Sequence, residues 1–145
     1  MRAYRLHETG QIEKAFEWLK KGAEAGNTSC MIWLGVLYGD GIGSDPHNKK
    51  EIFWYKKAWR KNDSSAPNNL AIVYKNQHKY DLAEKWFKIA IESGDGDANL
   101  ELAKLYLIMR CPAELIKKYL RATINSRYVT GHSIEEAEKI LNEYA

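Results

Sequence analysis

Apolar residues recur along this chain at the spacing of α-helices, in short segments separated by polar turns. In one early segment the apolar residues that share a helical face are Ile12, Ala15, Phe16, Leu19 and Ala23. Gly or Asn punctuates the end of most such segments, as at Gly26 and Asn27. No segment alternates as a half-buried strand does. The pattern predicts an all-α protein of about nine helices, at residues 2–8, 11–25, 28–39, 48–62, 65–77, 80–93, 97–109, 112–127 and 133–144.

Five positions repeat three times in the same order: Leu, a small residue, Tyr, an aromatic residue and Ala. The first copy is Leu34, Gly35, Tyr38, Trp54 and Ala58; the second is Leu70, Ala71, Tyr74, Trp86 and Ala90; the third is Leu102, Ala103, Tyr106, Tyr119 (one place out of register) and Ala122. The copies begin 36 and then 32 residues apart. A period in this range is typical of stacked helical repeats.

Short connections between the predicted helices favour antiparallel pairs. We expect one repeat domain over residues 1–145, with a partial repeat at 1–27, repeats at 28–63, 64–95 and 96–127, and a capping helix at 133–145. Asp97 is a predicted N-cap, and Ser133 with Glu136 has the spacing of a capping box. The small residues are expected where two helices approach closely, and Leu and Tyr of a first helix are expected to pack against the aromatic residue of the second.

The stretch from Leu34 to Asp45 and on to Ala58 resembles a Sel1-like repeat, with its Gly-x-Gly loop at Gly41 and Gly43 followed by Trp-Tyr-x-Lys-Ala. The Sel1-like family usually has Ala at the position of Glu51, so looser packing is expected there. The later copies lack the loop and resemble short tetratricopeptide units. The resemblance covers about residues 11–127. It implies a right-handed superhelical solenoid, protein–protein binding, a concave face made by the first helix of each pair, and no chemistry of its own.

Composition and charge exclude several other classes. Apolar residues form 45% and charged residues 28% of the 145, which is ordinary for a globular domain, and the net charge of +3 is too small to indicate nucleic-acid binding by itself. The chain has no apolar run of signal-peptide or membrane-span length, which predicts a cytoplasmic protein without a membrane partner. Cys30 and Cys111 do not recur with the repeat, so we expect reduced, small apolar side chains.

The residues that could carry chemistry are sparse. His7, His47, His78 and His132 have no ligand-like spacing to another His, Cys or carboxylate, so the sequence predicts no metal and no cofactor. The loop from Gly39 to Gly43 follows a helix rather than a strand, and it is interpreted as a turn that needs positive φ, not as a phosphate cradle. We expect no enzyme. The rival hypothesis is a β-lactam-related enzyme, but that Sel1-like subgroup resembles an array with paired Cys in each repeat.

The first helices indicate where a partner binds. Counting away from Leu and Tyr places a groove on Ile32, Val36, Asn68, Ile72, Lys75, Leu100, Lys104 and Leu107. Apolar side chains beside Asn and Lys are typical of a peptide- or domain-binding groove. A second candidate surface is an electrostatic patch on helix 48–62: Lys49, Lys50, Lys56, Lys57, Arg60 and Lys61. The basic residues are interpreted as a solvated face, with an acidic protein partner as the second interpretation and nucleic acid as the third.

The sequence thus predicts a scaffold that binds a partner protein or peptide through the concave groove. The alternative hypothesis is a bacterial immunity protein of the antitoxin type that neutralises a cognate toxin, since a short chain made of repeats is compatible with that role. The partner's identity and the oligomeric state are left open by the residues.

Overall fold

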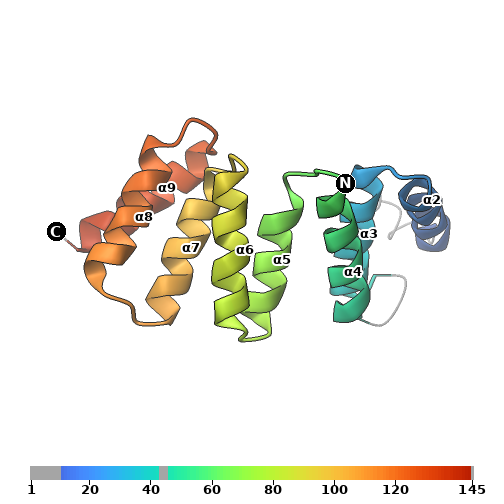
Figure 1. The fold of residues 1–145 in the computed structure, drawn as a ribbon, viewed down its shortest axis with the longest axis horizontal. Helices are drawn as coiled ribbons and strands as arrows, with labels where there is room; N and C mark the ends of the chain where they lie inside the picture. Colours follow the sequence, from blue (N-terminus) through green and yellow to red (C-terminus); the bar gives the residue numbers. More distant parts are fainter. Residues whose placement is uncertain (1–10, 43–45, 145) are drawn as a thin grey trace. The chain divides into compact units, whose positions relative to one another are not determined.

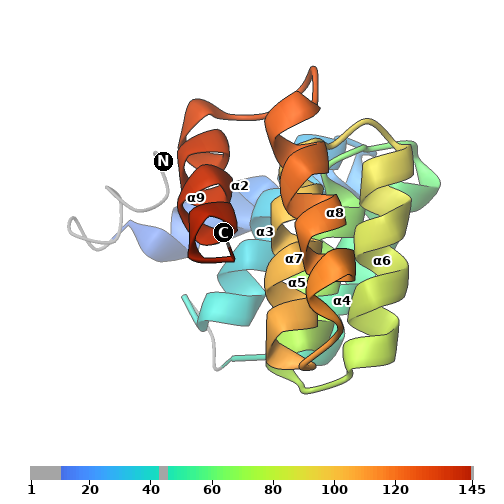
Figure 2. The same cartoon turned by 90° about the vertical axis from the view of Figure 1, so that its left-hand side faces the viewer.

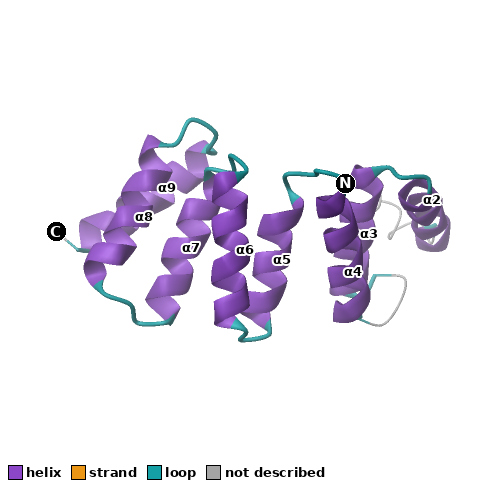
Figure 3. Cartoon of the chain, viewed as in Figure 1, coloured by secondary structure: helices purple, strands orange, loops and turns teal. Residues whose placement is uncertain are grey.

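The computed structural model describes residues 11–42 and 46–144 of the chain, and all of their regular structure is helical (Figure 3). The eight helices of this part are α2 (Ile12–Glu24), α3 (Thr28–Asp40), α4 (Asn48–Arg60), α5 (Ala66–Asn76), α6 (Tyr80–Glu92), α7 (Asp97–Ile108), α8 (Ala113–Asn125) and α9 (Gly131–Glu143) (Figure 1). Each differs from its predicted range by at most two residues at either end. The predicted helix 2–8 lies outside the described residues, as do Gly43 and Asp45 of the predicted loop.

The chain divides into two compact units, residues 1–66 and 67–145, hereafter unit 1 and unit 2. In unit 1, α2 packs against α3 and α3 against α4. In unit 2, α6 packs against α7, α7 against α8, and α9 against both α7 and α8. Figure 2 shows α9 beside the α7–α8 pair. The all-helical class is therefore confirmed, and so are two of the predicted helix pairs, α3 with α4 and α7 with α8.

Most of the repeated residues belong to the core, whereas Trp86, Tyr119 and Ala122 are half-buried. Leu34, Leu70 and Leu102 are fully buried, and the repeated Tyr residues are nearly so. Gly35 lies against the ring of Tyr55, and a Cβ atom at this position would come 2.5 Å from Tyr55 Cε1. In the third copy the rings of Tyr106 and Tyr119 join α7 to α8 at a centroid distance of 5.5 Å. The close approach at the small residue and the aromatic contact between paired helices are as predicted.

Six successive helices end in the same backbone turn. After each of α2 to α7, one residue has left-handed φ, and the next N–H donates to the carbonyl five residues before it. The left-handed residues are Gly26, Gly41, Asn62, His78, Gly94 and Arg110. The turn predicted from the Gly-x-Gly loop is thus confirmed at Gly41, whose φ is 69°.

Two predicted helix caps are wrong. Thr130, not Ser133, is the N-cap of α9, and its side-chain oxygen accepts a hydrogen bond from Ser133 N–H at 3.4 Å. The N-cap of α7 is Gly96, and Asp97 already belongs to the helix. The Asp97 carboxylate instead accepts hydrogen bonds from the N–H and hydroxyl of Thr130, both at 2.9 Å. A short-range pattern could not identify this acceptor, because the two residues are 33 positions apart.

Candidate functional site

The predicted groove of unit 1 lies on α3 and is partly filled. Ile32 and Val36 are half-buried, and Ile32 packs against the core cluster of this unit. Trp33, which sequence reasoning missed, is 39% exposed. The signal that sequence reasoning missed was a large aromatic residue outside the repeated positions, although such residues can also be buried, as Phe87 is. The exposed apolar surface of α3 thus centres on Trp33.

The groove residues of α5 are evenly half-buried, whereas those of α7 range from buried to exposed. Asn68, Ile72 and Lys75 of α5 are half-buried. On α7, Leu107 is half-buried and the neighbouring Ile108 is 52% exposed. Leu100 is only 2% exposed and belongs to the core, so its assignment to the groove is wrong. Its position two residues before Leu102 placed it on the opposite side of α7, where a groove was expected. The helices that surround α7 bury this side as well.

The two groove lysines of unit 2 are already engaged within the chain. Lys75 Nζ lies 3.7 Å from Glu101, and Lys104 Nζ lies 3.6 Å from Glu101 and 2.8 Å from Glu136 on α9. Burial opposes the charge of Lys104, but Glu136 and Glu101 outweigh it and raise the Lys104 pKa. These four side chains form an ionic ladder across α5, α7 and α9. A ligand would have to compete with these partners for either lysine.

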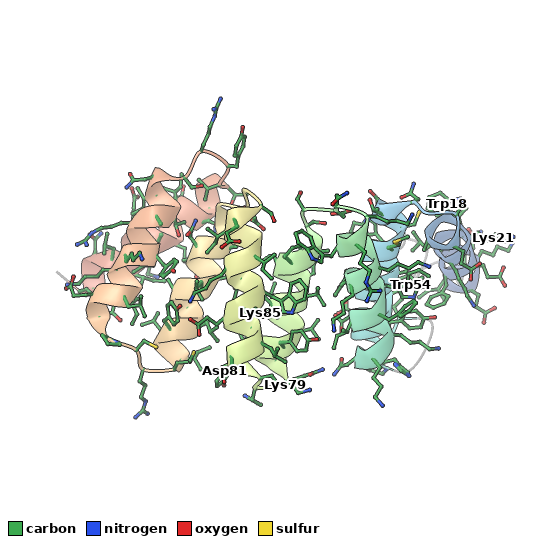
Figure 4. The ribbon with its side chains drawn as sticks, viewed as in Figure 1. Trp18, Lys21, Trp54, Lys79, Asp81 and Lys85 are labelled. Carbon is green, nitrogen blue, oxygen red and sulfur yellow. The ribbon has the colours of Figure 1, made fainter. Side chains whose placement is uncertain are left out.

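The predicted electrostatic patch has a different environment. Lys49, Lys50, Arg60 and Lys61 are exposed, and Lys56 and Lys57 are half-buried. None of the six forms an ion pair with another residue in the described part of the chain. Two of them lie over aromatic rings instead: Lys50 Nζ is 5.1 Å from the Tyr38 centroid, and Lys57 Nζ is 5.2 Å from that of Trp54. Figure 4 labels Trp54 on α4.

The acidic residue of α4, Glu51, lies against Gly39 of α3 and forms a hydrogen bond with Tyr55 of its own helix. Burial raises the pKa of Glu51 to about 7; a hydrogen bond with Tyr55 opposes the shift, and the nearby charge of Asp40 adds to it. The Glu51 carboxyl group lies directly against Gly39, where any Cβ atom would collide with it. The looser packing expected at this position is therefore not found, because Gly39 provides the space that Glu51 fills.

The His, Cys and carboxylate side chains of the described residues do not cluster as metal ligands would. Within residues 11–42 and 46–144, no group of three or more His, Cys, Asp or Glu side chains could hold a metal ion. Cys30 is buried, Cys111 is half-buried, and both are free thiols. His47 caps α4, where Nδ1 accepts a hydrogen bond from Lys50 N–H at 3.2 Å. Every helix of this part is too short or too polar to cross a lipid bilayer.

Sequence comparison finds two relatives, and no protein-family model matches the chain. One is a sel1-like repeat-containing protein of Acanthamoeba polyphaga mimivirus, which is 32% identical over 113 residues, 77% of this chain. The other is a chitin synthase regulator of Saccharomyces cerevisiae, 34% identical over 73 residues, 46% of this chain. The matches span only 21% and 10% of these longer proteins.

Two solved structures share the fold. A Sel1 repeat protein from Oxalobacter formigenes matches 97% of this chain and 60% of its own length, with a TM-score of 0.72 and 22% identity. A protective antigen of uropathogenic Escherichia coli strains, which displays an SLR fold, matches 84% of this chain and 29% of its own length, with a TM-score of 0.66 and 26% identity. The chain thus has Sel1-like repeat homologues in both sequence and structure, in agreement with the resemblance of its Leu34–Ala58 motif.

Proposed function

We propose that this chain is a non-enzymatic scaffold of the cytoplasm that binds a partner protein through the first-helix faces, taken unit by unit. These faces are Ile32, Trp33 and Val36 on α3 in unit 1, and Ile72 on α5 with Leu107 and Ile108 on α7 in unit 2. The observation that carries the proposal is the exposure of two large apolar side chains on these faces. Trp33 is 39% exposed and Ile108 is 52% exposed, and neither is a repeated core position. Aromatic and aliphatic anchors of this kind dominate the energy of protein interfaces.

Two further observations support the proposal. The Sel1-like fold is commonly used for protein–protein interaction, and one relative is a regulator of chitin synthase. The groove lysines do not contribute an obvious attraction, because Lys75 and Lys104 already have carboxylate partners. The partner's apolar residues would therefore supply most of the affinity on these faces, with the lysines at a polar rim.

Affinity purification from the native cell, followed by mass spectrometry, tests this function. The variant Trp33→Gln with Ile108→Gln removes both anchors, and Gln is well tolerated in helices. Leu82→Gln is the matched control, since Leu82 is 40% exposed but lies on the second helix α6. We expect the double variant to lose the proteins that the wild type and the control retain. Equal recovery with all three would contradict the assignment of these faces.

The immunity hypothesis is a narrower form of the same proposal, in which the partner is a toxin. Protection of cells that co-express a neighbouring toxin gene would be its specific result.

A further inference from the structure

The outward face of α4 combines cations with an exposed aromatic ring. Lys49, Phe53, Lys56, Lys57 and Arg60 follow one another at intervals of four, three, one and three residues. In a helix of 3.6 residues per turn, this spacing places all five on one side. The buried residues of α4, which are Trp54, Tyr55 and Ala58, lie on other sides of the helix. We call these five residues the α4 basic face.

The charge of this face is not neutralised within the described residues. None of its four cations forms an ion pair there. Lys56 and Arg60 are four residues apart, and Lys57 and Arg60 three apart, so like charges face each other along the helix and disfavour it. An anionic partner would relieve this repulsion, whereas the lysines of the ionic ladder already have carboxylates.

Phe53 gives the face an apolar centre held in place by its neighbours. It is 52% exposed, and its ring meets that of Trp54 edge to face, at a centroid distance of 5.1 Å and an interplanar angle of 82°. Lys57 Nζ lies 5.9 Å from the Phe53 centroid and 5.2 Å from that of Trp54. A contacting ligand therefore meets an anchored ring bordered by positive charge.

We propose that the α4 basic face binds an acidic protein segment that carries an aromatic or aliphatic side chain among its carboxylates. The carboxylates pair with Lys49, Lys56 and Arg60, and the apolar side chain packs on Phe53. Charge complementarity selects an acidic ligand. Phe53 is the one exposed aromatic residue of α4, whereas surfaces for single-stranded nucleic acid stack successive bases on several rings. This second surface is independent of the first-helix faces.

Fluorescence anisotropy with a defined probe tests the proposal. The probe is a labelled synthetic peptide of about ten residues, made of Asp and Glu with a central Phe. Such a peptide, extended at about 3.3 Å per residue, is longer than the stripe from Lys49 to Arg60, which is about 17 Å at 1.5 Å per helical residue. The comparison ligands are the same peptide with Ala for Phe, a basic peptide of equal length, and a single-stranded DNA of equal charge. Measurements at about 50 and 150 mM salt separate the electrostatic part of the affinity, which salt screens, from the apolar part, which it does not screen.

The variant Lys49→Glu with Arg60→Glu reverses two exposed charges that have no ion-pair partner in the described chain. Lys85→Glu with Arg121→Glu is the matched control, because it changes the net charge equally at exposed residues of α6 and α8; Figure 4 labels Lys85. Circular dichroism verifies that both variants are folded. We expect the first variant to lower the affinity for the acidic peptide about tenfold, and the control to lower it less than twofold. Phe53→Ala should lower the affinity for the Phe-containing peptide several-fold and leave the affinity for the Ala-containing peptide unchanged.

Three results would overturn the proposal: no preference for the acidic over the basic peptide, equal losses in the two charge-reversal variants, or tighter binding of the DNA. None of these would affect the purification result expected for Trp33 and Ile108, so failure of this inference is distinguishable from failure of the proposed scaffold function.

Discussion

Units 1 and 2 are built on the same repeated residues, but they treat surface charge in opposite ways. In unit 2, Lys75, Glu101, Lys104 and Glu136 pair across three helices. In unit 1, the cations of α4 have no ion-pair partner in the described chain, and the one acid of that helix is turned against Gly39. The repeat therefore specifies the interior of each unit, while the charges at variable positions either stabilise the unit or stay available for a ligand.

The largest expected effect tests whether the interiors are equivalent. Leu34 of unit 1 and Leu102 of unit 2 occupy the same repeat position, and both are fully buried. Replacement of either by Ala should lower the free energy of unfolding by about 2–5 kcal/mol, through lost burial and the cavity left behind. Urea denaturation of the two variants measures both losses. Destabilisation by Leu→Ala substitutions varies by about 2 kcal/mol among buried sites. A larger difference between the two variants would show that the repeat position does not define equivalent cores.

A smaller effect separates the repeated Tyr residues. The Tyr106 hydroxyl donates a 2.7 Å hydrogen bond to Glu84, which joins α7 to α6. Tyr38, at the same repeat position in unit 1, meets Phe16 edge to face at 5.1 Å. Tyr106→Phe should lower the free energy of unfolding by about 1.5–2 kcal/mol, because it removes a hydrogen bond to a charged group. Tyr38→Phe keeps its ring contact and should cost less than about 0.5 kcal/mol. Similar losses in thermal unfolding would contradict this distinction.

Glu51 makes the stability of unit 1 depend on pH. Its folded-state pKa is raised to about 7 from an ordinary value of 4.5. Between these values the unfolded chain has lost the proton that the folded chain retains, so the contribution of Glu51 to stability falls as pH rises through this window and stays low above it. Glu51→Gln should therefore be more stable than the wild type at pH 8, on the order of 1 kcal/mol, because the side chain is only partly buried and solvent screens the effect. Urea denaturation at pH 4.5 and pH 8 checks this, and a constant difference between the two proteins would refute it.

The smallest effect addresses the surface charges directly. Lys104→Gln breaks contacts to Glu101 and Glu136 and should destabilise the protein by about 0.5–1 kcal/mol, less at high salt. Arg60→Gln removes like-charge repulsion on α4 and should leave stability unchanged or raise it by about 0.3 kcal/mol. Chemical denaturation at two salt concentrations compares them. Destabilisation by Arg60→Gln as large as that by Lys104→Gln would mean that the cations of α4 have a structural role.

Much of the fold could be predicted from the sequence because its determinants are local or periodic. Helical spacing located the described helices, and the repeated Leu and Tyr identified core positions in all three copies. The repeated Ala did so only in the first two copies, because Ala122 is half-buried and Thr123 takes the core position. The errors occurred where a residue's partner is distant in sequence. Asp97 resembles a cap for α7, but its carboxylate accepts hydrogen bonds from Thr130. Leu100 has the position of a groove residue, but the helices around α7 bury it.

The candidate surfaces were predictable to a lesser degree. Composition identified the basic residues of α4, but their lack of ion-pair partners depends on the three-dimensional positions of all the acids. The pairing of Lys75 and Lys104 likewise required the placement of α9. Trp33 was overlooked because counting from the repeat considers only positions expected to face a groove, whereas its exposure depends on how completely neighbouring helices cover α3.

The left-handed turn that ends α2 to α7 has a consequence for how such a chain can change in length. Each helix is ended by the left-handed residue and by the hydrogen bond from the next N–H to the carbonyl five residues before it. Both features lie before the connecting segment begins. The connection after Gly41 extends to His47, whereas after His78 a single residue, Lys79, precedes α6. Insertions or deletions immediately after the turn can therefore alter a loop without moving the register of either helix. The N–H of Cys111 completes the turn that ends α7, so the junction between Cys111 and Pro112 is a suitable site for grafting a new loop onto the scaffold.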